Sequence, residues 1–524
     1  MAFTERDLFH RRPLAASASI RKSTEMNNNC ARRKRRASSK DQFAAIRVIV
    51  LGVSIPLVLL ILLVTRRAGE RAAAIPTKSD ELSDSSRFLK QWKPRLRMSD
   101  EGTGRGSIMH NNDEKSSASK RANHDKIEAD SKQDSKSIYR YKFSASELGY
   151  DIYNCPPTPP DDYPRAWPVT DIISNWNPND VNTIPPSHRE VYHSLCIFDY
   201  QTQYETALVY RNAEKPFIIR NDPKVMAASK KWSSPNYLLE NLPQKKMYTE
   251  RSPVNHFMFY NPSQRKNYKN WVQPVNDVVS MTLAEWLERS LERDAVALSD
   301  GDLKKRVETM REKRMERGLL QEQQEKPEDD EIKEDYDREE EKRHNWYYWR
   351  LNAFVEDVEK DGYSKLTFDD MPFFDPRKEE ESAFYLVDPS DQRGINCRFG
   401  MRGVIAESHC DLSRNMIALL DGERRYIIGH PNQCQNLYLY PRGHPSGRHA
   451  SFDWSNPSNW DTHPKFRNAL HSEVVMKAGD VMYLPTAWFH HIINLSTNIQ
   501  CNIRSGISYE NNDALKECGF KLPK

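Results

Sequence analysis

Hydrophobic and polar positions divide this chain into a long polar N-terminal part and a C-terminal part that is rich in short apolar runs. Residues 48–65 (VIVLGVSIPLVLLILLVT) interrupt the polar part, carry no charge and lie between Arg47 and Arg66. An uncharged run of this length is at the lower end of what spans a hydrocarbon core as a helix. The pattern therefore predicts one transmembrane helix, a signal anchor, within residues 47–66.

Basic residues around this run predict its orientation. They are denser on the N-terminal side, in residues 32–47, than on the far side, and cytoplasmic flanks carry the excess of Lys and Arg. We therefore expect residues 1–46 to be the disordered cytoplasmic tail of a single-pass, type II membrane protein, with the C-terminal domain in the lumen of the endoplasmic reticulum or Golgi. Two alternatives stay open. A signal peptide could be cleaved at residues 72–74, and a reversed anchor would place the domain in the cytosol or nucleus.

The segments that follow differ in how many apolar positions they offer. Residues 67–144 are rich in Ser and charged residues and poor in aromatics, which predicts a flexible stalk. Apolar positions then become frequent, so we expect the folded domain to begin at about residue 145. Within residues 145–301, apolar positions at helical spacing after Thr282 predict a capped helix. Residues 302–345 are dominated by Lys, Arg, Glu and Asp, and they predict a solvated, charged helical insertion.

Residues 346–524 show a different pattern, with short β-like runs separated by turn residues. The runs are 383–387, 417–422, 425–429, 481–485 and 499–503. Many short strands at close spacing are typical of a sandwich or barrel. The pattern predicts a mainly β fold with flanking helices.

Composition narrows the classes of function. The mean hydropathy is −0.82 and the net charge is +4 over 524 residues, with basic residues scattered along the chain. This predicts no nucleic-acid partner. The eight cysteines form no C-x-x-C pair, which argues against a zinc ribbon or a thioredoxin-like motif. At least one cysteine is expected to be unpaired if the others form disulfides, because seven follow the apolar run: Cys155, Cys196, Cys397, Cys410, Cys434, Cys501 and Cys518.

The strongest chemical signal is the pair His409 and Asp411, with a further His-His pair at residues 490–491. Residues i and i+2 of a strand project to the same side, so the first two side chains can meet one metal ion. Two imidazoles and one carboxylate form the facial triad that binds Fe(II) and leaves positions open for a co-substrate and O₂. The alternative is a chance H-x-D sequence on a surface loop, which is plausible in a chain with 15 His.

Three ordered motifs near these residues carry a family resemblance. They are 437–445 (LYLYPRGHP), 453–457 (DWSNP) and 477–495 (KAGDVMYLPTAWFHHIINL). Over residues 397–510, and more thinly back to about 145, the chain resembles the JmjC-type, cupin-like 2-oxoglutarate oxygenases, in particular the asparaginyl hydroxylase that acts on hypoxia-inducible factor. The resemblance implies a double-stranded β-helix (jelly-roll) fold with Fe(II) and 2-oxoglutarate as cofactors and O₂ as co-substrate.

The resemblance also implies roles for single residues. The metal ligands would be His409, Asp411 and His490, whereas His491 would face the opposite way. The carboxylate of 2-oxoglutarate would be bound by Arg424, with Asn415 and Asn502 lining its pocket and Tyr347 or Tyr348 adding a hydroxyl. Two departures from the family stand beside the site. Ala406 replaces a Thr, and Ile503-Arg504 replaces an aromatic pair, so that Arg504 could reach the pocket or read the substrate.

These observations predict a membrane-anchored 2-oxoglutarate/Fe(II)-dependent dioxygenase, a hydroxylase of protein side chains with a protein as its partner. Histone demethylation is disfavoured because no chromatin-reader or zinc module is recognisable. The alternative is a non-catalytic, metal-binding cupin-like scaffold or binding module, since a fold does not decide a function by itself.

Overall fold

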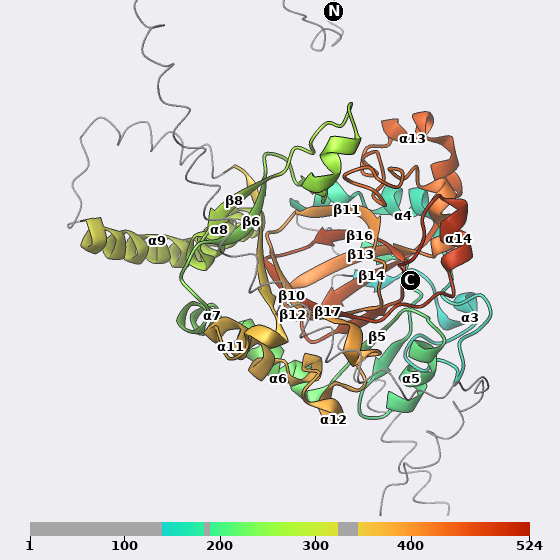
Figure 1. The fold of residues 1–524 in the computed structure, drawn as a ribbon, viewed down its shortest axis with the longest axis horizontal. Helices are drawn as coiled ribbons and strands as arrows, with labels where there is room; N and C mark the ends of the chain where they lie inside the picture. The colour runs from blue at the N-terminus through green and yellow to red at the C-terminus, as the bar shows by residue number, and fades with distance from the viewer. Residues whose placement is uncertain (1–138, 183–188, 323–343, 524) are drawn as a thin grey trace, which may run out of the picture. The chain divides into compact units, whose positions relative to one another are not determined.

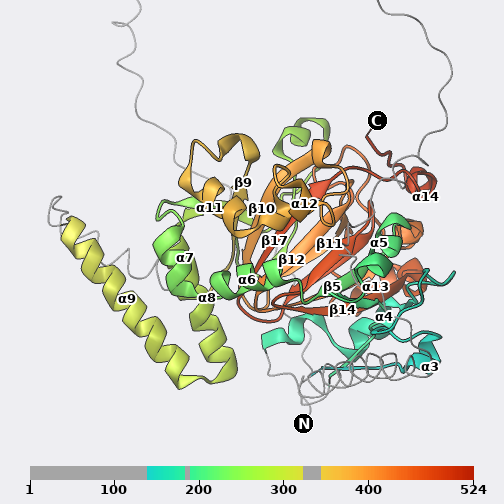
Figure 2. The same cartoon turned by 90° about the horizontal axis from the view of Figure 1, so that it is seen from below.

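The computed structural model describes residues 139–182, 189–322 and 344–523. All of these residues belong to one compact unit. Strands form two large sheets that face each other, and helices pack against the outer sides of both (Figures 1 and 2).

The larger sheet of the described chain has nine strands. In spatial order they are β4 (Ile197–Asp199), β5 (Phe217–Arg220), β15 (Val481–Leu484), β12 (Asn415–Asp421), β17 (Asn498–Ser505), β10 (Gln392–Gly400), β9 (Trp346–Ala353), β6 (Met247–Ser252) and β8 (Asp277–Met281).

The second sheet has six strands within the described ranges. Their order is β2 (Trp167–Pro168), β14 (Leu470–Lys477), β13 (Glu423–Gly429), β16 (Phe489–Asn494), β11 (Ile405–Cys410) and β7 (His256–Phe257). A separate two-stranded sheet pairs β1 (Tyr139–Tyr141) with β3 (Arg189–Val191).

Eight consecutive strands, β10 to β17, divide equally between the two large sheets. Strands β10, β12, β15 and β17 lie in the larger sheet, and β11, β13, β14 and β16 lie in the smaller one. This alternation is the topology of a jelly roll. The mainly β fold with flanking helices that the sequence predicts is confirmed in this part of the chain.

Helices flank the sheets. They are α3 (Ala145–Leu148), α4 (Val169–Asn175), α5 (Tyr204–Asn212), α6 (Pro223–Trp232), α7 (Pro235–Asn241), α8 (Leu283–Leu298), α9 (Gly301–Glu322), α11 (Gly362–Asp370), α12 (Glu379–Ser382), α13 (Ser458–Thr462) and α14 (Asn512–Glu517). Short 3₁₀ turns are η2 (Pro178–Asn182), η3 (Pro262–Asn267), η4 (Val355–Asp357), η5 (Pro372–Phe374), η6 (Pro389–Asp391), η7 (Pro431–Asn436) and η8 (Pro464–Asn468). Helix α6 packs on β12, and the Ser229 hydroxyl donates to the Leu420 carbonyl at 2.8 Å (Figure 2).

The predicted helix after Thr282 is confirmed as α8. The Thr282 hydroxyl accepts from the Glu285 N–H at 3.2 Å, and the Glu285 carboxylate accepts from the Thr282 N–H at 2.7 Å. This reciprocal cap satisfies donors that the first helical turn leaves free. Helix α9 follows at once and projects from the body of the domain in both views (Figures 1 and 2). It lies within the predicted charged insertion, whose residues 323–343 fall outside the described ranges.

The predicted strand at residues 383–387 is wrong. These residues form a turn after α12, in which Phe384 and Tyr385 are buried. The Tyr385 hydroxyl donates to the carboxylate of Asp222, the N-cap of α6, at 2.5 Å. The run is apolar because it packs against helices and aromatic rings, and a short apolar run does not distinguish such a turn from a strand.

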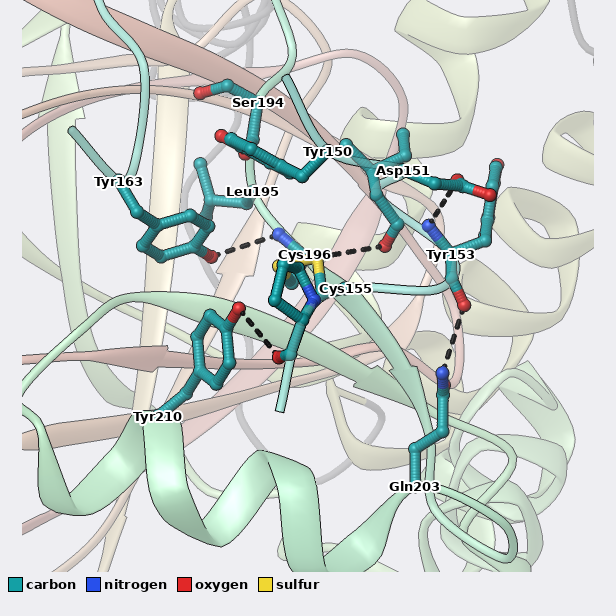
Figure 3. Close-up of a disulfide and its surroundings, with 12 residues drawn as sticks. Tyr150, Asp151, Tyr153, Cys155, Tyr163, Ser194, Leu195, Cys196, Gln203 and Tyr210 are labelled. Carbon is teal, nitrogen blue, oxygen red and sulfur yellow. Dashed lines mark hydrogen bonds between the residues drawn. A yellow bond between two sulfur atoms is a disulfide. The ribbon is translucent and has the colours of Figure 1, made fainter. Parts of the chain in front are cut away.

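Three disulfides cross-link the described domain: Cys155–Cys196, Cys397–Cys501 and Cys434–Cys518. The prediction that at least one cysteine stays unpaired is confirmed, since Cys410 is free and buried. Figure 3 shows how the first disulfide ties the segment before α4 to the start of β4. Beside it, the Cys196 N–H donates to the Tyr163 hydroxyl at 2.9 Å, and the Tyr210 hydroxyl donates to the Pro156 carbonyl at 3.1 Å.

The membrane localisation requires correction. No helix in the described ranges 139–182, 189–322 and 344–523 is long and apolar enough to cross a bilayer. The predicted span at residues 48–65 lies outside the described residues, as do the predicted tail and most of the predicted stalk. The transmembrane helix, the type II topology and the luminal location therefore have no structural support and are not retained.

Candidate metal centre and its cavity

His409, Asp411 and His490 come together at one end of the jelly roll. Strands β11 and β16 are antiparallel neighbours, and His409 lies directly opposite His490. A bulge between Ala406 and His409 interrupts the pairing. Asp411 follows the last residue of β11, and the ligand atoms of the three side chains all lie within 4.8 Å of one another. Such a set can hold one metal ion.

Both imidazoles are prepared to act as metal ligands. The His409 Nδ1 lies 2.7 Å from the Glu407 carbonyl, and the His490 Nδ1 lies 3.1 Å from the Trp488 carbonyl. A carbonyl only accepts hydrogen bonds, so each Nδ1 must donate and each Nε2 keeps its lone pair. Burial lowers the pKa of both rings, and therefore they are neutral at neutral pH.

Asp411 is held as a carboxylate. Burial alone would raise its pKa, but the Arg504 guanidinium and the neighbouring His490 hold that pKa below its usual range. Arg504 donates to Asp411 Oδ2 at 2.7 Å, and Asn415 Nδ2 lies 3.4 Å from the same oxygen. Arg504 thus reaches the pocket, which was one of the two possibilities left open by the sequence. It contacts the metal-facing carboxylate directly.

His491 lies on the other side of β16. Its ring stacks on Trp454 with centroids 5.2 Å apart, on the sheet face that also buries Phe489 and Ile493. His490 instead faces the interior of the jelly roll and lines the cavity. The structure therefore groups His490, and not its neighbour, with His409 and Asp411.

His449 is a site residue that the motifs did not single out. Its ring stacks on the His409 ring at 4.8 Å with an interplanar angle of 12°, and burial lowers its pKa to about 4. His449 pairs with His409 across an isolated β-bridge, in the segment that follows the LYLYPRGHP motif. It lies four residues beyond that motif, so the only sequence signal that could have indicated it is the clustering of histidines in this region.

The triad opens into a cavity of about 300 Å³ between the two sheets. Asn415 and Asn502, two predicted pocket residues, both line this cavity, as does Ala406. Phe257 and Phe259 provide an apolar wall, and Phe259 is 51% exposed, which marks the open side.

Four arginines give the cavity a positive lining: Arg350, Arg398, Arg448 and Arg504. Three of them have a defined partner, since Arg350 pairs with Glu250, Arg448 donates to the Cys410 carbonyl and Arg504 pairs with Asp411. Arg398 donates only to the Cys397 carbonyl at 3.3 Å, and it forms no ion pair among the described residues. Burial, together with the nearby Arg350, lowers the pKa of Arg398. An anion in the cavity would relieve this uncompensated charge.

Arg424 and Tyr347 are not among the residues that line the cavity. Arg424 is fully buried behind the wall, where its guanidinium donates to Asn498, to Gln500 at 2.7 Å and to the Arg398 carbonyl. Strand alternation turns Tyr347 away, toward Arg289, and brings Tyr348 to the cavity. The residues that line the cavity are instead Arg398 and Tyr348, and Tyr348 is the second of the two tyrosines that the resemblance allowed.

Arg424 still connects to the metal-facing carboxylate through a chain of side-chain hydrogen bonds. Arg424 donates to Gln500 at 2.7 Å, Gln500 donates to Asn502 at 3.1 Å, and Asn502 donates to Asn415 at 2.8 Å. Asn415 then faces Asp411 at 3.4 Å. A chain of this kind fixes which way each amide points, and it orients the carboxylate.

Comparisons with known proteins agree with this architecture. The family model described as "Cupin-like domain" matches residues 205–503, which is more than half of the chain. The lysine-specific demethylase JMJ31 of Arabidopsis thaliana is 21% identical over 174 residues, 31% of each chain. The mouse tRNA wybutosine-synthesizing protein 5 is 27% identical over 106 residues, 20% of this chain and 32% of its own. The JmjC domain-containing protein D of Dictyostelium discoideum is 26% identical over 106 residues, 20% of this chain and 23% of its own. The chain thus spans about a third or less of the length of these relatives.

Proposed function

Because the chain belongs to the cupin-like domain family, we propose that it is a 2-oxoglutarate- and Fe(II)-dependent oxygenase. One observation carries the proposal. Two neutral imidazoles and one carboxylate converge beside a cavity that holds an arginine without an acidic partner among the described residues. This donor set suits Fe(II) and occupies one face of it.

The chain's own residues would hold both cofactors. His409, Asp411 and His490 would bind Fe(II), which supplies O₂ activation when it is bound together with 2-oxoglutarate. Arg398 would bind the distal carboxylate of 2-oxoglutarate, because a guanidinium fork matches a carboxylate. Tyr348 and Tyr426 line the same cavity and would add hydroxyl contacts. Asn415 and Asn502 would keep Asp411 oriented.

We further propose that the reaction is hydroxylation of a protein side chain. One relative is named a lysine-specific demethylase and another a tRNA wybutosine-synthesizing protein, so their names do not choose between substrate classes. Support comes from the apolar wall of Phe257 and Phe259 at the open side of the cavity, which suits an aliphatic C–H group. The resemblance to an asparaginyl hydroxylase points the same way. Demethylation is the second reaction to be tested with the same enzyme preparation.

The first experiment is anaerobic loading with Fe(II) and 2-oxoglutarate. We expect a metal-to-ligand charge-transfer band in the wild-type protein, and we expect it to disappear in His409→Ala and in Asp411→Ala. His463→Ala, a histidine outside the cavity-lining set, is the matched control and should keep the band. A folded, iron-loaded wild-type protein without the band would refute the oxygenase proposal.

A measurement of turnover distinguishes an oxygenase from a non-catalytic, metal-binding scaffold. Exposure of the loaded protein to O₂ should release CO₂ from 2-oxoglutarate, and candidate peptides should raise that rate and gain one oxygen atom in mass spectra. Stoichiometric Fe(II) binding with no decarboxylation, even with such peptides present, would favour the non-catalytic cupin-like scaffold.

A further inference from the structure

A second group of ligating side chains lies beside the triad. It consists of His256 on β7, Glu407 on β11 and Asp453 in the loop after η7, and one ligand atom from each lies within 4.8 Å of the others. Strand β7 pairs in parallel with β11, with His256 opposite Ile405. The pairing of these strands therefore sets His256 beside Glu407, whose side chain also lines the cavity.

A fourth side chain faces the same carboxylate. The Nδ1 of His256 lies 2.5 Å from Glu407 Oε1 and 3.9 Å from Asp453 Oδ1, and the Nδ1 of His491 lies 3.8 Å from Glu407 Oε2. Ligands about 2.0–2.1 Å from a tetrahedral Zn²⁺ lie about 3.4 Å from one another. The separations here bracket that value. To admit the ion, the short contact between His256 and Glu407 would have to open by about 1 Å, and the ring of His491, which lies outside the set whose ligand atoms are all within 4.8 Å of one another, would have to shift toward that set.

Unpartnered atoms point to a missing ligand. Glu407 is 5% exposed, and its Oε2 has no hydrogen-bond partner among the described residues. His491 is 0% exposed, and neither of its ring nitrogens has one. A buried polar atom without a partner costs about 1–3 kcal/mol, so such atoms are rare and need an explanation. Here the oxygen and the Nδ1 face each other across 3.8 Å.

We propose that His256, Glu407, Asp453 and His491 form a second metal site, separate from the triad, that binds a divalent transition-metal ion such as Zn²⁺. Two imidazoles and two carboxylates suit Zn²⁺, whereas Ca²⁺ and Mg²⁺ prefer oxygen ligands alone. Four protein ligands close the coordination shell, which is typical of a structural site and leaves no position for a substrate.

The site would join four elements next to the triad. It would tie the edge strand β7 and the loop that contains Asp453 to β11 and β16. His256 is adjacent to Phe257, which lines the cavity, so the metal would also fix the apolar wall. Glu407 and His409 lie on the same strand, and the second metal would therefore support the geometry of the first site.

The test isolates this site by removing the triad. The double variant His409→Ala, Asp411→Ala is stripped with a chelator, checked for native circular dichroism and titrated with Zn²⁺. We expect it to bind one equivalent, with an X-ray absorption spectrum of nitrogen and oxygen ligands only, including two imidazoles. Adding Asp453→Asn, which keeps an oxygen to accept from Ser455, or adding His256→Gln, should weaken binding by more than about tenfold. Asp461→Asn, an exposed carboxylate outside the group, is the control and should change nothing.

A second measurement protects the test against a misfolded double variant. Stripped wild-type protein should bind two equivalents of Zn²⁺, and Asp453→Asn alone should bind one. A hydrogen-bonded His256–Glu407 pair without metal is the competing explanation. It predicts one equivalent in the wild type and none in the folded double variant, and that result overturns the second site. The charge-transfer test of the oxygenase is read with Fe(II) at the triad, so either proposal can fail without the other.

Discussion

Arg398 provides the sharpest test of how the cavity binds its co-substrate. The structure gives its guanidinium one hydrogen bond, to the Cys397 carbonyl, and no acidic partner within the described residues. Its side chain faces the cavity, so Arg398→Gln removes the charge without opening a hole in the apolar core. We expect this variant to fold normally and to lose affinity for 2-oxoglutarate.

The size of the loss follows from the chemistry of the contact. A hydrogen bond to a charged group contributes about 1.5–3 kcal/mol, and each 1.4 kcal/mol is a factor of ten in Kd. We therefore expect the Kd for 2-oxoglutarate to rise by about 10- to 150-fold. The affinity for Fe(II) alone should change little, because within the described residues Arg398 forms no hydrogen bond or ion pair with any of the three metal-facing side chains.

The assay is an anaerobic titration of the Fe(II)-loaded protein with 2-oxoglutarate, followed by the charge-transfer band and by calorimetry. Arg393→Gln is the matched control, since Arg393 lies on the same strand with a side chain that is 49% exposed. Arg424→Lys tests the residue that the sequence favoured. It should lower the melting temperature, because it breaks the contacts to Asn498 and Gln500, and it should affect Kd less than Arg398→Gln does. A folded Arg398→Gln protein whose Kd changes by less than about twofold would refute the assignment.

Three further predictions concern stability and metal affinity. Burial raises the pKa of Asp421 to about 7, so the folded state holds this proton more tightly than the unfolded chain, and stability falls as pH rises from about 4 to 7. In urea unfolding, Asp421→Asn should therefore have the same free energy of unfolding as the wild type at pH 4 and a higher one at pH 8, by up to about 4 kcal/mol. An equal difference at both pH values would contradict this cause. The Cys434–Cys518 disulfide closes a loop of 84 residues and ties α14 to η7. The double variant Cys434→Ser, Cys518→Ser should therefore lose about 2–4 kcal/mol of its free energy of unfolding in a chemical denaturation experiment. An unchanged midpoint would show that the disulfide does not stabilise the fold. Asn415→Ala should weaken Fe(II) binding by about 10- to 100-fold in an anaerobic titration, because Asp411 loses its orienting amide. A change below twofold would show that Arg504 is sufficient to orient Asp411 without Asn415.

The extent to which the site was predictable depends on how local each signal is. His409 and Asp411 are two residues apart, so strand alternation could bring them together from the sequence alone. The choice of His490 over His491 came from the family resemblance, because alternation shows only that the two rings face opposite ways. Arg398 lies on β10, in the larger sheet, whereas His409 and His490 lie on strands of the smaller sheet. Nothing in its local sequence distinguishes it from the other arginines. Its role depends on the absence of an acidic partner, which is a property of the tertiary structure. The strand predicted at residues 383–387 was wrong because the burial of this segment also depends on the tertiary structure: its apolar side chains pack against elements distant in sequence.

Arg424 shows why a matching motif position does not fix a contact. A shorter or flexible cation at this strand position could extend into the cavity, but the three hydrogen bonds of Arg424 hold its planar guanidinium behind Gln500. The positive charge at the cavity wall is then supplied from the opposite side by Arg398. The two arginines are linked, because Arg424 donates to the Arg398 carbonyl at 3.4 Å and, through Gln500, Asn502 and Asn415, reaches Asp411. The buried guanidinium of Arg424 therefore supports both the backbone of Arg398, the proposed carboxylate anchor, and the orientation of Asp411. Its loss should impair the binding of both cofactors, although it would touch neither.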